Sequence, residues 1–258
     1  MASKKPARKG YRFDLTTRTE SEIAYLADLE KTFEKSPFSV MERLTNFALY
    51  VPRQNLTTLL VKYEIFSRIL GVQGSVIECG VCFGGGLMSF AQLSAILEPT
   101  NYQRQIIGFD TFSGFPRLSG KDARALSKDA HAGGLAVDSH EEVSRCVALY
   151  DRNRFVGHIP KVELVKGDAT QTIPKYLERN PHLVVSLLYL DFDVYEPTRV
   201  ALELLRPRMP KGAVIGFDEL NLKNWPGETM AVVETLGLSS LRIERCPFGS
   251  TISFAQLT

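Results

Sequence analysis

The sequence predicts a doubly wound α/β fold, and three features of its pattern support this. Five apolar segments recur between residues 74 and 217, with helical segments between most of them, as in parallel sheets with crossover helices. These runs show no polar alternation, which is typical of strands that helices cover on both faces. Two further strands near the C-terminus are joined by only "CPFG", which forces an antiparallel hairpin. We therefore expect a mostly parallel seven-stranded sheet that ends in this hairpin.

Each expected strand is short and apolar, and helical patterns follow most of them. The strands are expected at residues 74–79, 105–110, 161–166, 184–190, 213–217, 241–245 and 250–256. The helices of the same region are expected at residues 85–97, 139–150, 171–179, 196–207 and 226–237. Together these elements define one domain over residues 74–258.

The N-terminal third is expected to be helical and to contain no strand. Its helices are expected at residues 19–35, 38–49 and 55–70. Thr19 and Glu22 have the spacing of a capping box at the start of the first helix. We expect a helical extension over residues 19–73, preceded by a disordered basic tail at residues 1–18.

A long polar stretch, residues 111–158, interrupts the alternation of strands and helices. It follows the carboxyl end of an expected strand, which is where ligands bind in open α/β sheets. Connections of this length are uncommon unless they serve a function or are mobile. We expect the insertion to form a lid over a binding site, and a purely structural insertion remains the alternative.

Composition and charge argue against several classes of partner. The chain of 258 residues has a net charge of +2, so nothing global points to nucleic acid or to an acidic membrane. No apolar run approaches the ~20 residues of a membrane span, and the N-terminal stretch lacks the apolar core of a signal peptide. We therefore expect a cytoplasmic protein without nucleic-acid or membrane partners.

The four cysteines do not form a disulfide scaffold in a chain of this length. Cys79 and Cys82 form a C-x-x-C, but there is no second such pair and no nearby histidine to complete a zinc site. The pair also lies where a strand turns into a glycine run. We interpret these cysteines as small core residues.

Carboxylates stand at the carboxyl ends of all five expected parallel strands. They are Glu78, Asp110, Asp168, Asp191 with Asp193, and Asp218 with Glu219. Any one of them has an alternative interpretation as a helix N-cap or turn residue. Because parallel strands end at one edge of the sheet, the whole set predicts a ligand site there. Asp191 and Asp193 share a side if the strand persists, since side chains alternate with period two.

A glycine-rich turn, "ECGVCFGGG", follows the first of these strands. Glycines such as Gly80 and Gly84 let the backbone approach a ligand closely, and the next helix offers free N–H groups. The spacing is not the G-x-G-x-x-G of dinucleotide binding, because Cys82 stands in place of the middle glycine. The turn therefore argues against a nicotinamide-dependent oxidoreductase.

From residue 74 onward the order of motifs resembles the class I S-adenosylmethionine-dependent methyltransferases. More narrowly, it resembles the macrocin O-methyltransferase family of sugar O-methyltransferases. The resemblance is carried by "IECGVCFGGG" (77–86), "GFDTFSGFP" (108–116), "VKGDATQTIP" (165–174), "YLDFDVYEPTRVALELLRPRMPKGAVIGFDE" (189–219) and "WPGETMAV" (225–232). It implies a Rossmann-like domain, S-adenosylmethionine as cofactor, and a sugar acceptor that is free, nucleotide-linked or part of a natural product. It also implies a homo-oligomer.

The resemblance implies roles for the residues around the cofactor. Glu78, Gly80 and the loop through Gly84 would hold its methionine end. Asp110 would bind the ribose hydroxyls, and Asp168 would accept from the adenine amino group.

The resemblance further implies a magnesium ion held by Asp191, Asp218 and Glu219. The family usually shows two aspartates where this chain has Asp218 and Glu219. A sugar hydroxyl is a weak nucleophile, and coordination to a divalent cation lowers its pKa and orients it. Magnesium prefers hard oxygen ligands. Asp191 or Asp193 would then be the catalytic base, with Asp191 as the preferred candidate.

Other functions stay open at this point. A methyltransferase of amines or nucleic acids typically presents an amide-and-proline loop after the fourth strand, where this chain has the acidic "DFDVYEP". Another small-molecule hydroxyl could replace the sugar. A non-catalytic protein of the same fold would have no need of the full set of acids, and binding of cofactor without magnesium would favour it.

Overall fold

The computed structural model describes residues 19–248 and 251–258. The expected tail at residues 1–18 lies outside the described residues. The chain divides into two compact units, Met1–Pro52 and Arg53–Thr258. In the described part, no helix has both the length and the apolar character needed to cross a bilayer.

The first unit is helical in its described part. It contains α1 (Glu20–Glu34), α2 (Val40–Thr45) and a 3₁₀ turn, η1 (Phe47–Leu49). The predicted capping box is present, because Thr19 Oγ1 accepts a bond from the Glu22 N–H and the Glu22 side chain accepts one from the Thr19 N–H at 2.8 Å. None of the residues in these three elements is buried.

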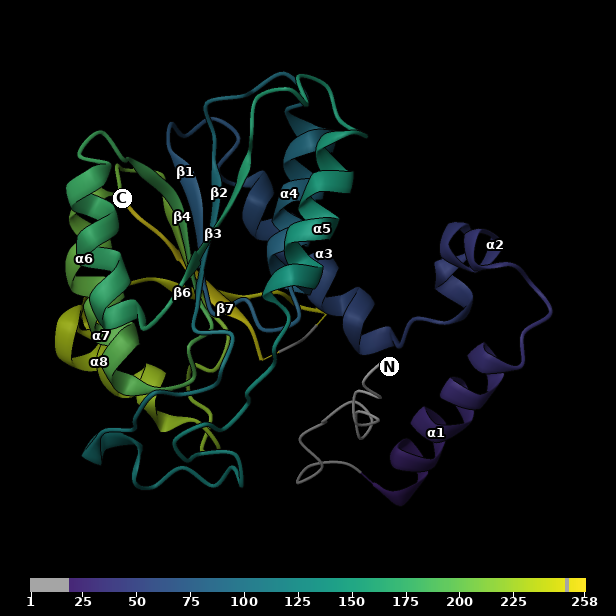
Figure 1. Cartoon of the computed structure of the whole chain (residues 1–258). Helices are drawn as coiled ribbons and strands as arrows, with labels where there is room; N and C mark the ends of the chain where they lie inside the picture. The colour runs from purple at the N-terminus through teal and green to yellow at the C-terminus, as the bar shows by residue number, and fades with distance from the viewer. Residues whose placement is uncertain (1–18, 249–250) are drawn as a thin grey trace, which may run out of the picture. The chain divides into compact units, whose positions relative to one another are not determined.

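The second unit is built on a seven-stranded sheet with the order β3-β2-β1-β4-β5-β7-β6 (Figure 1). Its strands are β1 (Ser75–Cys79), β2 (Ile106–Asp110), β3 (Val162–Lys166), β4 (Val185–Leu190), β5 (Val214–Phe217), β6 (Ile243–Arg245) and β7 (Ser253–Gln256). Strands β1 to β5 pair in parallel, and β7 runs antiparallel to both β5 and β6. The predicted fold class, with its C-terminal antiparallel hairpin, is confirmed.

Helices cover both faces of this sheet (Figure 1). One face carries α3 (Arg53–Ser67), α4 (Gly85–Leu97) and α5 (His140–Asp151), and the other carries α6 (Ala169–Arg179), α7 (Tyr195–Leu205) and α8 (Pro226–Thr235). Each face has its own buried apolar cluster, which explains why the central strands have no exposed side. The edge strand β3 differs from the expectation, since only Val165 in it is buried.

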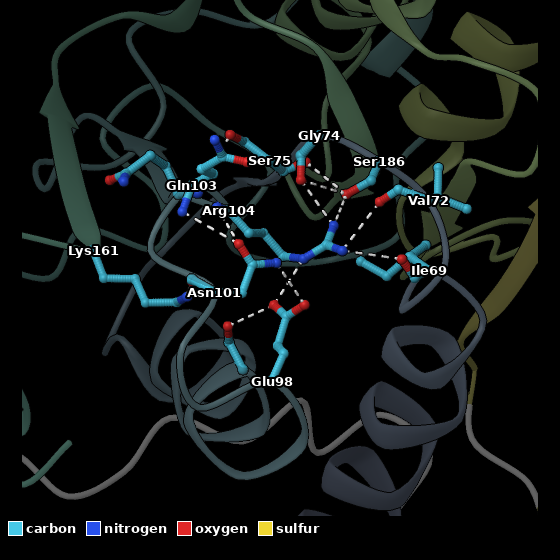
Figure 2. A network of polar contacts seen from close by, with 12 residues as sticks. Ile69, Val72, Gly74, Ser75, Glu98, Asn101, Gln103, Arg104, Lys161 and Ser186 are labelled. Atoms are coloured by element: carbon cyan, nitrogen blue, oxygen red, sulfur yellow. Dashed lines mark hydrogen bonds and ion pairs between the residues drawn. The ribbon is translucent and has the colours of Figure 1, made fainter. Parts of the chain in front are cut away.

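The boundary between the units falls before α3, whereas the sequence placed it after residue 73. The difference arises because α3 buries apolar side chains, among them Ile65 and Phe66, in the cluster on the α4 face of the sheet. Arg104 then connects the segment that follows this helix to the sheet (Figure 2). Its guanidinium donates to the carbonyl oxygens of Ile69 and Val72 at 3.1 and 3.0 Å.

Candidate functional site

A cavity of about 380 Å³ lies at the carboxyl edge of the parallel strands. This volume is within the range of small-molecule sites, which is roughly 300–1,000 Å³. The sheet order places β1 between β2 and β4, so the connections diverge there and leave a crevice. The acids among the described residues that line the cavity are Asp110, Asp168, Asp191, Asp193, Glu196 and Glu219. Arg117 is the one basic residue in the same lining.

The glycine turn after β1 is shaped by its neighbours. Gly80 has a φ of +107°, and a Cβ there would lie 1.9 Å from the carbonyl oxygen of Asp191. Only glycine lets β1 and β4 approach so closely at this point. The backbone N–H groups of Val81 and Cys82 both donate to Asp110 Oδ2, at 2.7 and 2.8 Å. Asp110 therefore fixes the loop as well as lining the cavity.

The predicted cofactor residues divide into two groups. Gly80, Asp110 and Asp168 line the cavity, whereas Glu78 and Gly84 do not. Glu78 is 1% exposed, and a Cβ on Gly84 would lie 2.7 Å from Val143 Cγ2. A role of these two residues at the cofactor stays a prediction.

Asp168 also fulfils the alternative interpretation as a helix cap. Its Oδ1 accepts from the backbone N–H and from the hydroxyl of Thr170, at 2.9 and 2.8 Å, at the start of α6. A capping carboxylate is stabilised there by the free N–H groups and by the helix dipole. The same side chain therefore caps α6 and lines the cavity.

Three carboxylates meet beside the glycine turn. One oxygen each of Asp191, Asp193 and Glu219 lies within 4.8 Å of the others. The predicted reason for the closeness of the two aspartates is wrong, because β4 ends at Leu190 and Asp193 has a φ of +62°. The two aspartates are brought together by a tight left-handed turn and not by the alternation of side chains along a strand.

Asp218 lies outside this group of three. Its Oδ1 accepts a hydrogen bond from the hydroxyl of Tyr189. The structure thus joins Asp191 and Glu219 of the predicted metal ligands and adds Asp193 to them.

The electrostatics of the acidic group are those of crowded like charges. Burial raises the pKa of Asp191 well above its usual range, and repulsion by Asp218 and Asp193 adds to this. Burial and the charge of Asp218 likewise raise the pKa of Glu219, and they raise the pKa of Asp193 to about 8. A cation among these oxygens would remove the repulsion.

The donor set suits a divalent cation. All its members offer oxygen, which Mg²⁺ prefers. Glu219 is 9% exposed, and its Oε2 is buried without a hydrogen-bond partner in the described part of the chain. A buried carboxylate oxygen without a donor is costly unless a cation or a proton satisfies it.

Sequence reasoning missed Glu228, which is fully buried in the first turn of α8. Its Oε1 accepts from the backbone N–H of Glu219 at 3.2 Å, while its Oε2 has no partner among the described residues. Burial raises its pKa well above the usual range, with Asp218 as the largest charge contribution. In the sequence Glu228 is indistinguishable from an ordinary acid at a helix N-terminus.

The insertion at residues 111–158 lines the cavity through its part before α5, with residues between Thr111 and Val137. Asp122 in this part is 3% exposed and accepts from the backbone N–H of Tyr195 at 2.9 Å, which ties the insertion to the start of α7. The later part contains α5, where the Tyr150 hydroxyl donates to the carbonyl oxygen of Ala91 in α4 at 2.7 Å. The opening and closing of the insertion as a lid stays a prediction.

Two aromatic rings contribute to the wall of the cavity. Phe115 of the insertion and Trp225 before α8 both line it, with ring centroids 5.5 Å apart. Tyr195, the other aromatic considered for an acceptor pocket, is not in the lining, and its hydroxyl donates to Glu234 at 2.6 Å.

Comparison with known proteins identifies relatives by sequence. Residues 54–234 match the family model described as macrocin-O-methyltransferase (TylF), which is more than half of the chain. The chain is 28% identical over 153 residues to the 8-demethyl-8-(2,3-dimethoxy-alpha-L-rhamnosyl)-tetracenomycin-C 4'-O-methyltransferase of Streptomyces olivaceus. That match spans 58% of this chain and 54% of the relative, so the chain spans about half the length of the curated relative it matches.

Solved structures agree with this assignment. CalS11, a calicheamicin methyltransferase, has a TM-score of 0.89 at 34% identity and covers 96% of this chain and 98% of its own. A second CalS11 structure, described as a TDP-rhamnose 3'-O-methyltransferase of calicheamicin biosynthesis, has a TM-score of 0.80 at 33% identity, covering 93% and 95% of the two chains. The O-methyltransferase NovP, at 22% identity and a TM-score of 0.61 over 78% and 79%, supports the fold alone.

Proposed function

The chain belongs to the macrocin O-methyltransferase family, and we propose that it transfers the methyl group of S-adenosylmethionine to a hydroxyl of a sugar. The observation that carries the proposal is the meeting of Asp191, Asp193 and Glu219 at the cavity beside the glycine turn. The printed names of two similar proteins support a sugar acceptor: the curated relative acts on a rhamnosyl natural product, and the second CalS11 structure is described as a TDP-rhamnose enzyme.

The reaction is proposed to depend on Mg²⁺. Asp191, Asp193 and Glu219 would hold the ion, with Asp218 as a fourth candidate ligand. Bound in the cavity, the cofactor would supply an electrophilic sulfonium methyl, and the cation would lower the pKa of a coordinated sugar hydroxyl. Glutamate at position 219 fits this role, because its Oε2 is buried and has no donor among the described residues.

The chain's own residues divide the remaining work. The backbone at Gly80 allows close approach of the cofactor, and Asp110 and Asp168 offer carboxylates to its ribose and adenine. Asp191 would accept the proton of the sugar hydroxyl, because a base must lie within hydrogen-bond reach of the proton that it takes. Phe115 and Trp225 would exclude water from the transfer.

The sugar is proposed to be a deoxysugar, linked either to a nucleotide or to a natural product. Among the described residues, six acids and one arginine line the cavity, so most of the charge on an anionic acceptor must lie outside it or be met by the cation and by Arg117. TDP-rhamnose and a rhamnosylated natural product, which the names of the two relatives contain, are the first two acceptors to compare.

Calorimetric titration with S-adenosylhomocysteine tests the cofactor without knowledge of the acceptor, and NAD⁺ is the control ligand. We expect micromolar binding of the first and no binding of the second. Methyl transfer to a rhamnose acceptor should then require Mg²⁺ and stop on chelation. Absence of S-adenosylhomocysteine binding, with and without metal, would overturn the proposed cofactor.

The variant Asp191→Asn tests the proposed base. It should lower turnover by about 10²-fold or more, because general-base catalysis contributes roughly that much. The affinity for S-adenosylhomocysteine should stay within about threefold of the wild type. Unchanged turnover in this variant would exclude Asp191 as the base.

A further inference from the structure

A buried polar network around Tyr189 adjoins the acidic group. Its residues belong to the core of the second unit and do not line the cavity. Tyr189 of β4 is 0% exposed, and its hydroxyl donates to Asp218 Oδ1 at the end of β5. Tyr189 is the first residue of the 189–219 motif, but neither the roles that the resemblance implies nor the proposed reaction uses it. Its ring is wholly within the core, so the hydroxyl is placed by packing.

Lys62 of α3 lies over the face of the Tyr189 ring. The lysine is 3% exposed, and its Nζ lies 3.5 Å from the centroid of the Tyr189 ring and 4.5 Å from that of Phe90. It also forms a buried ion pair with Glu78 Oε1 at 2.9 Å. A desolvated cation over an aromatic face is attracted by the ring quadrupole, so Lys62 restrains the ring.

Two glycines leave the space that this network needs. In the sheet register Tyr189 pairs with Glu78 of β1 and with Gly216 of β5. A Cβ on Gly216 would lie 2.6 Å from Tyr189 Cδ2, and a Cβ on Gly86 would lie 2.0 Å from Glu78 Oε1. Both distances are too short for a side chain at either glycine. The Tyr189 ring therefore lies over Gly216 on its way to Asp218, and Glu78 lies against Gly86.

Asp218 stands next to the acidic group. It directly precedes Glu219, and its backbone N–H donates at 3.1 Å to the carbonyl oxygen of Leu190, the residue before Asp191. The Tyr189 hydroxyl occupies one of the two carboxylate oxygens of Asp218.

We propose that Tyr189 is a positioning residue of the divalent-cation site. Its hydroxyl holds Asp218 through Oδ1 and leaves Oδ2 of the same carboxylate to act on the cation. The inference rests on the proposed magnesium dependence. Hydrogen-bond donors behind metal-binding carboxylates fix their orientation, and their loss typically lowers metal affinity by roughly 10–100-fold.

The test compares Tyr189→Phe with Tyr176→Phe. Tyr176 is a matched control, because it is also buried, packs edge-on against Phe109, and donates to Glu163 Oε2 at 2.7 Å on β3, away from the acidic group. Binding of Mn²⁺, as a substitute for Mg²⁺, is measured by calorimetry with saturating S-adenosylhomocysteine, which also stabilises each variant.

We expect Tyr189→Phe to weaken Mn²⁺ binding about tenfold or more, with S-adenosylhomocysteine affinity unchanged, and Tyr176→Phe to leave both unchanged. Excess Mg²⁺ should restore the turnover of Tyr189→Phe. In an Asp218→Asn background the tyrosine change should have no further effect on Mn²⁺ affinity.

Mn²⁺ affinity of Tyr189→Phe within about twofold of the wild type, with cofactor binding intact, would overturn the positioning role alone. A further loss in the Asp218→Asn background would overturn the route through Asp218. Absence of Mn²⁺ binding to the wild-type protein would overturn the proposed metal dependence and this inference together, and the wild type by itself reveals that outcome.

Discussion

The two adjacent glycines at the start of α4, Gly85 and Gly86, differ in the space around them. A Cβ on Gly86 would meet Glu78 Oε1 at 2.0 Å and Lys62 Nζ at 2.9 Å, whereas a Cβ on Gly85 would meet nothing within 4 Å. Gly86 is therefore required by the buried ion pair, and Gly85 is not required by any neighbour.

The substitutions Gly86→Ala and Gly85→Ala form a matched pair. The first should lower the free energy of unfolding by about 1–3 kcal/mol or more, because overpacking separates a buried ion pair. The second should be neutral or raise it by about 0.4–1 kcal/mol, since alanine restricts the unfolded chain. Urea unfolding measures both, and equal effects of the two changes would contradict the packing argument.

The buried Lys161 makes the free energy of unfolding depend on pH, and a substitution at this position can separate its contribution from those of other groups. Burial lowers the pKa of this ammonium to about 8, against the opposing charge of Glu98, from a usual value of 10.5. Below pH 8 both states are protonated, so the folded state bears the full desolvation cost. Between pH 8 and 10.5 the folded amine is neutral while the unfolded one still binds a proton, so the cost shrinks as the pH rises.

The wild-type protein should therefore gain stability relative to Lys161→Met between pH 7 and pH 9.5. Other titrating groups are common to both proteins and cancel in this difference. Denaturant unfolding of the two at both pH values measures it. A constant difference would show that Lys161 stays charged in the folded protein.

At the scale of elements, Arg104 connects four segments at the amino edge of the sheet (Figure 2). It pairs with Glu98 at the end of α4 at 2.7 Å and donates to the carbonyl oxygen of Gly74 before β1 at 2.8 Å. It also donates to Ser186 Oγ in β4 and to the carbonyl oxygens of Ile69 and Val72 in the segment after α3. One planar guanidinium with five N–H donors thus satisfies groups that no shorter side chain could reach together.

Arg104→Lys should cost about 3–5 kcal/mol of stability even though the charge is kept, because buried carbonyl oxygens and a carboxylate lose their donors. Arg68→Lys is the control, since its pair with Glu64 is 28% and 41% exposed and is worth about 1 kcal/mol or less. Chemical denaturation compares them. If Arg104→Lys were no worse than the control, the network would not be what joins α3 to the sheet.

At the scale of the whole molecule, the core and the site belong to the same unit. The described residues that line the cavity all lie within Arg53–Thr258, and residues 54–234 carry the family match. The helices α1 and α2, which belong to the other unit, contain no buried residue.

A chain that starts at Arg53 should therefore fold and bind S-adenosylhomocysteine with an affinity within about threefold of the full chain. Its unfolding midpoint should differ little, because hydrophobic burial supplies most of the stability. Calorimetry and thermal unfolding of the two proteins measure this. Loss of cofactor binding in a folded truncated protein would show that the first unit contributes to the site.

The sequence alone determined the fold class and the edge at which the site lies. Strands such as "VSLLYL" are recognisable because continuous apolar runs need helices on both faces, and the short link "CPFG" leaves no room for a crossover. Carboxylates at parallel strand ends must share one edge, so Asp110 and Asp191 could be assigned to one cavity before any coordinates. These conclusions follow from local periodicity and chain connectivity.

Only the tertiary structure decided which acids meet and what holds them. Asp193 joins Asp191 through a left-handed turn that strand periodicity cannot anticipate. Glu78 was expected at the cofactor, yet it is buried against Lys62 of a helix 16 residues earlier in the chain. Tyr189 reaches Asp218 across a glycine in the neighbouring strand. Such pairings depend on sheet register and helix packing, because they join residues distant in sequence whose types alone do not specify a partner.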